Sequence, residues 1–415
     1  MKKKFVLLSF LYLSLKFSFS QSLSNDLIKS ISFQKQNNNS LSNTHIGALN
    51  ERFTISFDIL SGLEHDLYYV IEHCDYNWEK SKLMKSEYIQ GFDDVKIENY
   101  FSSFNTYQIY THYNLSFPNS NTSFKKSGNY FIKILDEYGE ELFRRKFILY
   151  ENLASVPIEI KRSREIEFIN QKQVVNFEIN PINIEFNNPE KTVKVKVFKN
   201  NNLNYSIENI KPLYNIGKKL IYKYDDELSF WGGNEYLYFE NKFIRNTNIK
   251  ISGFDLGDIY SNFLYTHFAR KDKKYTYQPD INGSFLFSVN NSSEPEFEAD
   301  YVNIYFSLKK PDNFNLQNKI YVIGEFNNYE ISDRYIVNFN PKSNIFETSL
   351  KLKQGFYNYK YVVVDLENKI LHGEIDGNFD ETENVYNVIV YYRNFGDRYD
   401  RVVGVGKGFS EYITN

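Results

Sequence analysis

Hydrophobic and polar residues alternate along much of the chain, and this pattern predicts β-strands. The clearest runs are residues 53–57 and 193–197, in which every second residue is apolar. Such alternation lays one side of a strand on a core and leaves the other side in water. After the leading segment, no apolar stripe of helical spacing extends over a dozen residues, and strands do not alternate with helices. We therefore predict an all-β protein of tandem antiparallel β-sandwich domains.

Turn residues and linkers divide the chain into three predicted domains. An N-terminal β-sandwich domain is expected over residues 21–152 and a middle β-rich domain over residues 153–295. The stretch 292–296, with its proline and small polar residues, is the best linker, so a C-terminal domain is expected over residues 296–415. Strands are predicted at residues 52–60, 66–73, 107–115, 129–135, 141–150, 174–179, 192–200, 236–239 and 281–289.

The C-terminal domain has a turn at residues 324–329, a Gly-aromatic bend at residues 355–356 and a Tyr-Lys-Tyr strand at residues 359–361. This order resembles the early-set immunoglobulin-like sandwiches that flank starch- and glycogen-acting enzymes, which implies an immunoglobulin-like fold. Sugar-binding relatives of that pattern commonly carry Trp where this chain has Tyr329, and an aromatic row including Tyr357 follows. An exported carbohydrate-binding β-sandwich protein is therefore the alternative function, although strand aromatics more commonly fill a sandwich.

The first residues have the order of a secretory signal peptide. Three lysines are followed by an apolar run over residues 5–15 and then by small residues, so we predict cleavage after residue 20 and export. The run is shorter than the roughly 20 residues that span a bilayer, which favours cleavage over a retained signal anchor, the alternative. Cleavage removes four lysines and no acid, so 45 Lys and Arg remain against 52 Asp and Glu, a net charge of −7.

Composition and charge exclude several classes of protein. Aromatic residues make up 18% of the chain, with 37 Phe and 35 Tyr, which is typical of large ordered cores and not of a disordered chain. A negative chain without clustered Lys and Arg is not expected to bind nucleic acid, and the small basic set at residues 270–274 is interrupted by Asp272. The one cysteine, Cys74, cannot form an internal disulfide, so packing must supply the stability.

No common catalytic motif is present. The chain lacks Gly-x-Ser-x-Gly, a phosphate-binding glycine loop and His-Glu-x-x-His. The adjacent acids Asp93 and Asp94 would point to opposite sides of a strand, and the neighbours His73 and Cys74 cannot share a strand face. We predict no enzyme, no catalytic residue and no cofactor, and a hydrolase with an unfamiliar constellation is the remaining catalytic alternative.

Metal-binding patterns are incomplete. Residues 376–383 begin like a calcium loop, but the sixth position is Glu381 where Gly is required and the twelfth is Asn387 where Glu is required. A looser calcium site in this loop stays open. The histidines His65, His73 and His112 lack zinc-ligand spacing. No metal ligand is predicted.

Short motifs spread over most of the chain resemble the type IX secretion plug proteins. They occupy residues 68–78, 86–92, 103–106, 110–113, 117–119, 127–130, 232–235, 280–283, 298–301, 353–359, 381–386, 391–393 and 396–400. Trp231 departs from the family pattern, as it stands before the 232–235 motif where the family does not usually carry Trp. The candidate signature or partner-contact residues are His73, Cys74, Asp75, Trp78, Tyr88, Gly91, Phe104, Asn105, Thr106, His112, Tyr113, Asn234, Glu235, Tyr329, Tyr357 and Arg393.

The resemblance implies a non-catalytic periplasmic plug subunit that occludes the pore of the type IX secretion outer-membrane translocon. Its partner would be the barrel of that translocon, and it would lie at the inner face of the outer membrane as a peripheral protein. A barrel wide enough for folded cargo leaks unless a folded body blocks it, and a blocking body needs shape and polar rim contacts. The chain end at residues 401–410 lacks the short Lys-bearing strand expected of cargo, which favours a component of the machine.

Overall fold

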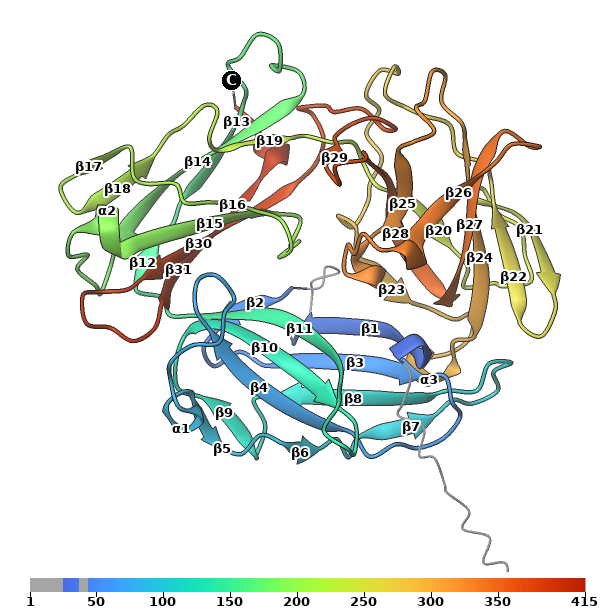
Figure 1. Ribbon diagram of the computed structural model, residues 1–415, viewed down its shortest axis with the longest axis horizontal. Helices are drawn as coiled ribbons and strands as arrows, with labels where there is room; N and C mark the ends of the chain where they lie inside the picture. The colour runs from blue at the N-terminus through green and yellow to red at the C-terminus, as the bar shows by residue number, and fades with distance from the viewer. Residues whose placement is uncertain (1–24, 37–43, 415) are drawn as a thin grey trace, which may run out of the picture.

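The computed structural model describes residues 25–36 and 44–414, and β-strands dominate these residues (Figure 1). The predicted all-β fold class is confirmed. Helical structure in the described residues is limited to α1 (Lys85–Tyr88), α2 (Pro189–Thr192), α3 (Pro295–Glu298) and 3₁₀ turns at Asn25–Leu27, Glu325–Asn327, Asp333–Tyr335 and Ser410–Tyr412. None of these described helices has the length and apolarity to cross a membrane. The predicted signal peptide, residues 1–20, lies outside the described residues.

The N-terminal domain is a two-layered β-sandwich. Its strands are β1 (Ile28–Lys35), β2 (Ile46–Ala48), β3 (Phe53–Ile59), β4 (Tyr68–Cys74), β5 (Ile89–Gly91), β6 (Val95–Lys96), β7 (Tyr100–Ser102), β8 (Thr111–Phe117), β9 (Thr122–Phe124), β10 (Gly128–Leu135) and β11 (Glu141–Tyr150). One sheet has the order β1-β3-β8-β7, the other β2-β11-β10-β4-β6, and β5 pairs with β9. The two sheets share one core because alternate residues such as Phe53, Ile55 and Phe57 point inward. At the β10–β11 turn, Gly139 has a φ of +82° and the Asp136 carboxylate accepts the backbone N–H of Glu140.

The second domain, here called the split domain, is built from two separate parts of the chain. Its strands are β12 (Ala154–Ser155), β13 (Ile158–Arg162), β14 (Lys172–Pro181), β15 (Val193–Lys199), β16 (Ser206–Glu208), β17 (Tyr214–Ile216), β18 (Lys219–Tyr222), β19 (Ser229–Trp231), β30 (Val385–Tyr392) and β31 (Arg401–Phe409). One sheet has the order β12-β14-β18-β17, with β13 and β19 also paired to β14, and the other has the order β16-β15-β30-β31. Phe177 of the first sheet and Val195 of the second belong to one shared core.

Glycines on β31 allow close approach of β12 and β13. A β-carbon on Gly406 would lie 2.3 Å from the backbone oxygen of Val156. We expect Gly406→Ala to lower the free energy of unfolding by about 1–3 kcal/mol, because overpacking forces the backbone apart. Urea unfolding measures this, with Gly253→Ala as the control, since the nearest atom to a β-carbon there is 3.8 Å away. Equal stability of the two variants would contradict the close packing.

The third domain, here called the inserted domain, contains the strands between β19 and β30. They are β20 (Leu237–Glu240), β21 (Ile251–Leu256), β22 (Tyr260–Leu264), β23 (Phe285–Phe287), β24 (Tyr301–Lys309), β25 (Lys319–Ile323), β26 (Ile336–Asn340), β27 (Ile345–Lys353), β28 (Gly355–Val364) and β29 (Ile370–Leu371). They form one sheet in the order β20-β28-β25-β26-β27-β24-β22-β21, with β23 and β29 also on β28. Phe239 on β20 contacts Phe306 on β24 at 5.9 Å between ring centroids, so the sheet folds back around its core.

The predicted division at residue 295 does not follow these sheets. Strands β20 and β23, within the predicted middle range 153–295, pair with β28, and β22 pairs with β24. Strand β30, within the predicted range 296–415, pairs with β15 across seven residues of each strand. The chain thus leaves the split domain after β19 and returns to it at β30. Alternation along a strand indicates which side is buried but not which strand lies beside it, so the sequence pattern could not reveal this return.

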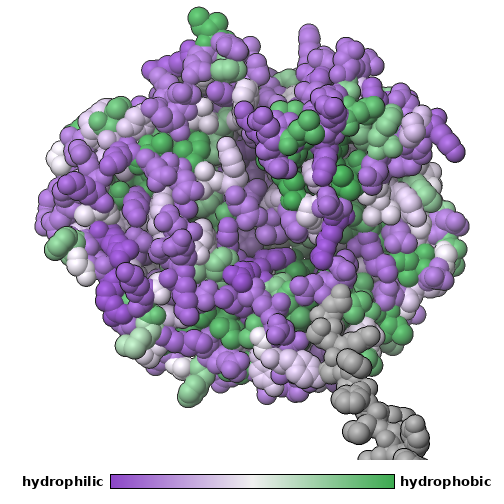
Figure 2. Space-filling model, viewed as in Figure 1, coloured by the Kyte–Doolittle hydropathy of each residue, from purple (hydrophilic) through white to green (hydrophobic). Residues whose placement is uncertain are grey.

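The three domains contact one another around a shared centre. In Figure 1 the N-terminal domain lies below, with the split and inserted domains side by side above it. A small apolar cluster joins the N-terminal and split domains, with Ile148 and Tyr76 on one side and Phe198 and Tyr391 on the other. The face shown in Figure 2 is largely polar, and it is hollowed near the place where the domains meet.

Candidate functional site

Several candidate residues of the N-terminal domain lie in its interior. The His73 ring is 1% exposed and lies among the rings of Tyr88, Tyr130 and Tyr399, with centroids 4.9–5.5 Å away. Its Nε2 is 3.2 Å from the Ser127 backbone oxygen. Burial lowers the pKa of His73 to about 4. These contacts make His73 a neutral part of the core.

The buried neutral state of His73 predicts a loss of stability in acid. The unfolded chain binds a proton near pH 6.5, whereas the folded chain does so only near pH 4, so stability falls as the pH falls through this window. The loss due to His73 should reach about 3 kcal/mol. Urea unfolding between pH 7 and pH 4 tests this against His73→Phe, which cannot titrate. Parallel pH profiles of the two proteins would contradict the assignment.

Cys74, Asp75 and Trp78 form a structural turn after β4. Burial, followed by the charge of Glu72, raises the pKa of the Cys74 thiol to about 12, so a thiolate nucleophile is disfavoured. The Asp75 carboxylate accepts the backbone N–H of Glu79 at 3.0 Å. Trp78, with a φ of +66°, packs on Phe131 at 5.5 Å between centroids.

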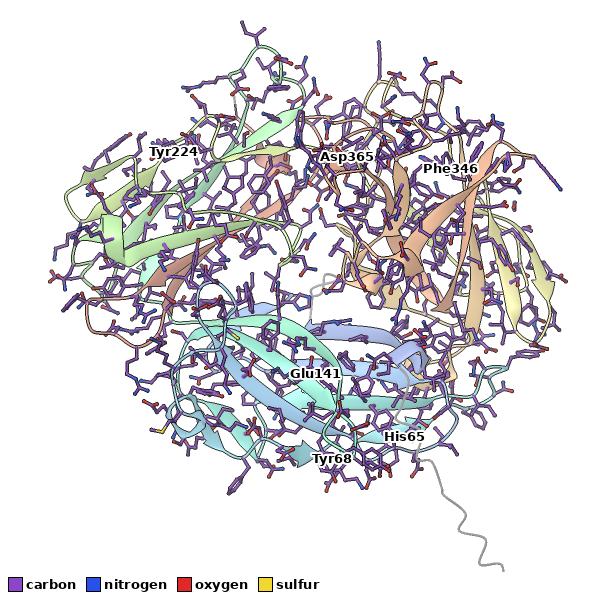
Figure 3. The ribbon with its side chains drawn as sticks, in the orientation of Figure 1. His65, Tyr68, Glu141, Tyr224, Phe346 and Asp365 are labelled. Carbon is purple, nitrogen blue, oxygen red and sulfur yellow. The ribbon has the colours of Figure 1, made fainter. Side chains whose placement is uncertain are left out.

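Gly91 and Tyr113 are structural residues of the N-terminal sandwich. Gly91 has a φ of +92°, and a β-carbon there would lie 2.1 Å from the Asn121 backbone oxygen, so only glycine fits. The Tyr113 ring stacks on Phe57 at 5.4 Å, and its hydroxyl accepts the His65 N–H at 2.7 Å. Figure 3 labels His65 near the base of the N-terminal domain.

His112 belongs to a buried ion cluster, here called the Asp58 cluster, between the N-terminal and inserted domains. Asp58 accepts hydrogen bonds from Lys353 at 2.7 Å, from His112 at 2.6 Å and from the Tyr301 hydroxyl at 2.6 Å. Asp58 and Lys353 are 0% exposed. Burial alone would raise the pKa of Asp58, but the Lys353 ammonium and the His112 hydrogen bond outweigh it and lower that pKa. The cluster ties β3 and β8 to β24 and β27.

The candidates Phe104, Asn105 and Thr106 lie in a loop that also docks on the inserted domain. The backbone N–H of Phe104 donates to the Phe297 oxygen at 2.9 Å. The Asp300 carboxylate accepts two successive backbone N–H groups of the same loop, at residues 107 and 108. Asn105 has a φ of +56°, and the Thr106 hydroxyl donates to the Gln108 oxygen at 2.9 Å. The Phe104 side chain itself stays 66% exposed.

Asn234 and Glu235 lie at the junction of the split and inserted domains. The Asn234 amide donates to the Asp376 backbone oxygen at 2.7 Å. Glu235 is 1% exposed, and one carboxylate oxygen accepts from the Tyr275 hydroxyl and from the Glu383 N–H. Its other oxygen has no hydrogen-bond partner among the described residues. Burial raises the pKa of Glu235.

A cleft beside this junction, here called the cationic cleft, is defined by Lys199 and Trp231 of the split domain and Lys360 and His372 of the inserted domain. Its volume is about 300 Å³. The Lys199 ammonium donates to the backbone oxygens of Trp231 at 2.7 Å and Gly232 at 2.8 Å, and the Lys360 ammonium lies 3.8 Å from the centroid of Tyr236.

The turn after β28 brings His372 to the cationic cleft. Asp365 lies on the side of the inserted domain that faces the split domain (Figure 3). Its carboxylate accepts hydrogen bonds from the backbone N–H groups of Glu367 and Lys369. The reversed chain forms β29, and His372 follows directly. Its ring is 6.1 Å from that of Trp231, with the two planes 22° apart.

The N-terminal domain is similar to a known protein family. Residues 28–151 match the family model described as "Type 9 secretion system plug protein 1st domain". Residues 28–151 therefore form a domain of the type IX secretion plug family. The plug domain coincides with the sandwich of β1 to β11. The family indicates a structural role in type IX secretion, in the cell envelope near the outer membrane, with the outer-membrane translocon as the general partner.

The whole chain has a relative of known structure. Eleven solved chains match it, among them the crystal structure of a hypothetical protein from Parabacteroides merdae, with a TM-score of 0.89 and 28% sequence identity. That match covers 93% of this chain and 98% of the other. No curated protein matches. The arrangement beyond the plug domain therefore recurs in a second protein.

Of the aromatic residues behind the carbohydrate alternative, Tyr357 is buried and Tyr329 is half-buried. Tyr357 is 1% exposed, and its ring is stacked between Phe239 at 5.1 Å and Phe285 at 5.6 Å. The Tyr329 hydroxyl donates to the Asn282 oxygen at 3.3 Å, and burial raises the pKa of Tyr329 well above its usual value. The Tyr357 ring therefore has no free face for a sugar.

Two acids of residues 376–383, where a looser calcium site stayed open, have other partners. Asp376 accepts from Arg270 at 2.8 Å and lies 3.1 Å from His267, while Asp380 pairs with Arg162 at 2.8 Å. Within residues 25–36 and 44–414 no group of three His, Cys, Asp or Glu side chains is placed to hold a metal ion.

The last candidate residue, Arg393, follows directly after β30. Arg393 donates from Nε to the Asp397 backbone oxygen at 3.1 Å and lies 3.8 Å from the Asp400 carboxylate, so it holds the connection between β30 and β31.

Some exposed apolar side chains were not predicted from the sequence. They include Leu63, Phe92, Phe101, Ile109, Phe254, Leu256 and Phe395. Lys199 and Lys360 were also missed, although the adjacent motif at residues 232–235 was identified.

Proposed function

We propose that the chain is a non-catalytic periplasmic plug subunit that occludes the pore of the type IX secretion outer-membrane translocon. The observation that carries the proposal is the plug domain at residues 28–151. The joining of three domains by buried groups supports it, because a body that blocks a wide pore must keep its shape. The Asp58 cluster and the apolar cluster at Phe198 and Tyr391 provide such joints. The carbohydrate alternative lacks comparable support, since the Tyr357 ring is covered on both faces.

Occlusion predicts that loss of this chain opens the outer membrane. Cells that lack the chain but retain the barrel should admit vancomycin, which an intact outer membrane excludes, and re-expression of the full chain should restore exclusion. Cells that lack both the chain and the barrel are the control and should stay sealed. A sealed membrane in cells that have the barrel without the chain would refute occlusion.

Physical association with the barrel is a separate test. Affinity purification of the tagged chain from solubilised membranes should recover the translocon barrel, identified by mass spectrometry. A tagged variant of the inserted domain, Gly253→Ala, should recover it equally. Repeated failure to recover any outer-membrane barrel would overturn the proposed partner.

A further inference from the structure

We propose that the cationic cleft binds a small organic anion, whose carboxylate or phosphate group lies between Lys199 and Lys360 and whose flat ring packs beside Trp231. This ligand-binding site goes beyond the proposed plug function. The charges, the space and the rings of the cleft each support it.

The two ammonium groups form a pair without an adjacent acid. Each Nζ lies 3.5 Å from the point where a β-carbon of Gly233 would stand, so the two charges are separated by no more than twice that distance. Among the described residues, no carboxylate lies within 4.0 Å of either nitrogen. Two like charges this close in a buried place repel each other and lose hydration, and a bound anion would relieve both costs.

Three acids farther away, Asp280, Asp376 and Glu235, attract the Lys360 ammonium. One carboxylate oxygen of Glu235 has no hydrogen-bond partner among the described residues. Asp376 is bonded to Arg270 and His267, and Asp280 accepts the backbone N–H of Asn282 at 2.6 Å. Burial raises the pKa of Asp280. Burial lowers the pKa of Lys360 to about 8. Burial, followed by the charge of Lys360, lowers the pKa of Lys199 well below its usual value, so a bound anion would favour the protonated form of both lysines.

The rest of the cleft suits a flat ring. Trp231 and His372 lie nearly parallel, and Tyr205 lies 6.5 Å from His372 between ring centroids. The Lys172 ammonium lies 5.0 Å from the centroid of the Trp231 ring. The volume of about 300 Å³ is at the lower end of small-molecule sites, which favours a compact ligand over a polymer. Gly233, with a φ of +74°, leaves the space between the lysines open.

Tryptophan fluorescence of the full chain can test binding. The chain has two tryptophans, so a Trp78→Phe background leaves Trp231 as the reporter. Benzoate and phenyl phosphate are the probes, and benzyl alcohol is the neutral ring control. We expect the two anions to change the fluorescence saturably at millimolar concentration or below, and benzyl alcohol not to do so. The anion with the higher affinity shows whether the site prefers a carboxylate or a phosphate group.

Lys360→Met should weaken anion binding at least tenfold, whereas Lys369→Met, which removes an exposed lysine of the nearby turn, should change it less than threefold. Circular dichroism checks that both variants are folded. Binding should also weaken above pH 8, where Lys360 loses its proton. No saturable change with either anion, or equal affinity in the Lys360→Met variant, would overturn the proposal. Neither result bears on occlusion, because the assay contains no barrel.

Discussion

Replacing Lys353 by methionine is expected to lower the free energy of unfolding by about 3–5 kcal/mol, because it leaves a buried carboxylate without its cation. Asp58 and Lys353 are both 0% exposed, so water cannot replace the lost ammonium. Urea unfolding followed by far-UV circular dichroism measures the loss. Since the cluster joins the N-terminal and inserted domains, small-angle scattering should also detect a larger radius of gyration before the main transition.

A second substitution distinguishes charge from packing. Asp58→Asn combined with Lys353→Met removes both charges, and we expect the double variant to recover at least half of the lost stability, because paired buried ions can be replaced by neutral groups at little cost. The surface pair Lys218 and Glu185 is the control, with side chains 74% and 75% exposed. Lys218→Met should change stability by less than about 1 kcal/mol. A double variant no more stable than Lys353→Met would mean that packing, not charge, dominates.

Two long strands of the N-terminal domain could be predicted closely from the sequence, whereas the strand predicted at residues 107–115 begins four residues before β8. The predicted strand at residues 141–150 has the same bounds as β11, and the strand predicted at residues 129–135 lacks only the first residue of β10. The prediction worked because both sheets of a sandwich have one buried face, so that burial has a period of two residues. Short edge strands such as β6, Val95–Lys96, lack enough residues for such a period.

The candidate residues were harder to interpret, because a sequence pattern cannot distinguish a buried aromatic residue from an exposed one. Tyr113 and Tyr357 are large and apolar enough to fill a core, and they do so. Phe104 has the same chemistry but stays 66% exposed, because its backbone holds the loop against the inserted domain. Lys199 and Lys360 are far apart in the sequence and meet only because the chain returns from the inserted domain to the split domain.

Phe147→Ala is expected to destabilise the plug domain by about 3–5 kcal/mol. The Phe147 ring is fully buried, and it contacts rings contributed by both sheets and by β9: Phe33 at 5.9 Å, Phe53 at 5.8 Å, Phe117 at 5.3 Å, Phe124 at 5.8 Å and Tyr130 at 5.2 Å. Removing the ring leaves a cavity that the surrounding strands cannot close without losing their hydrogen bonds. Phe147→Leu keeps most of the volume and should cost less than half as much, and Phe104→Ala should cost little. Urea unfolding measures all three. Equal losses for the alanine and leucine variants at residue 147 would show that ring packing does not hold the two sheets together.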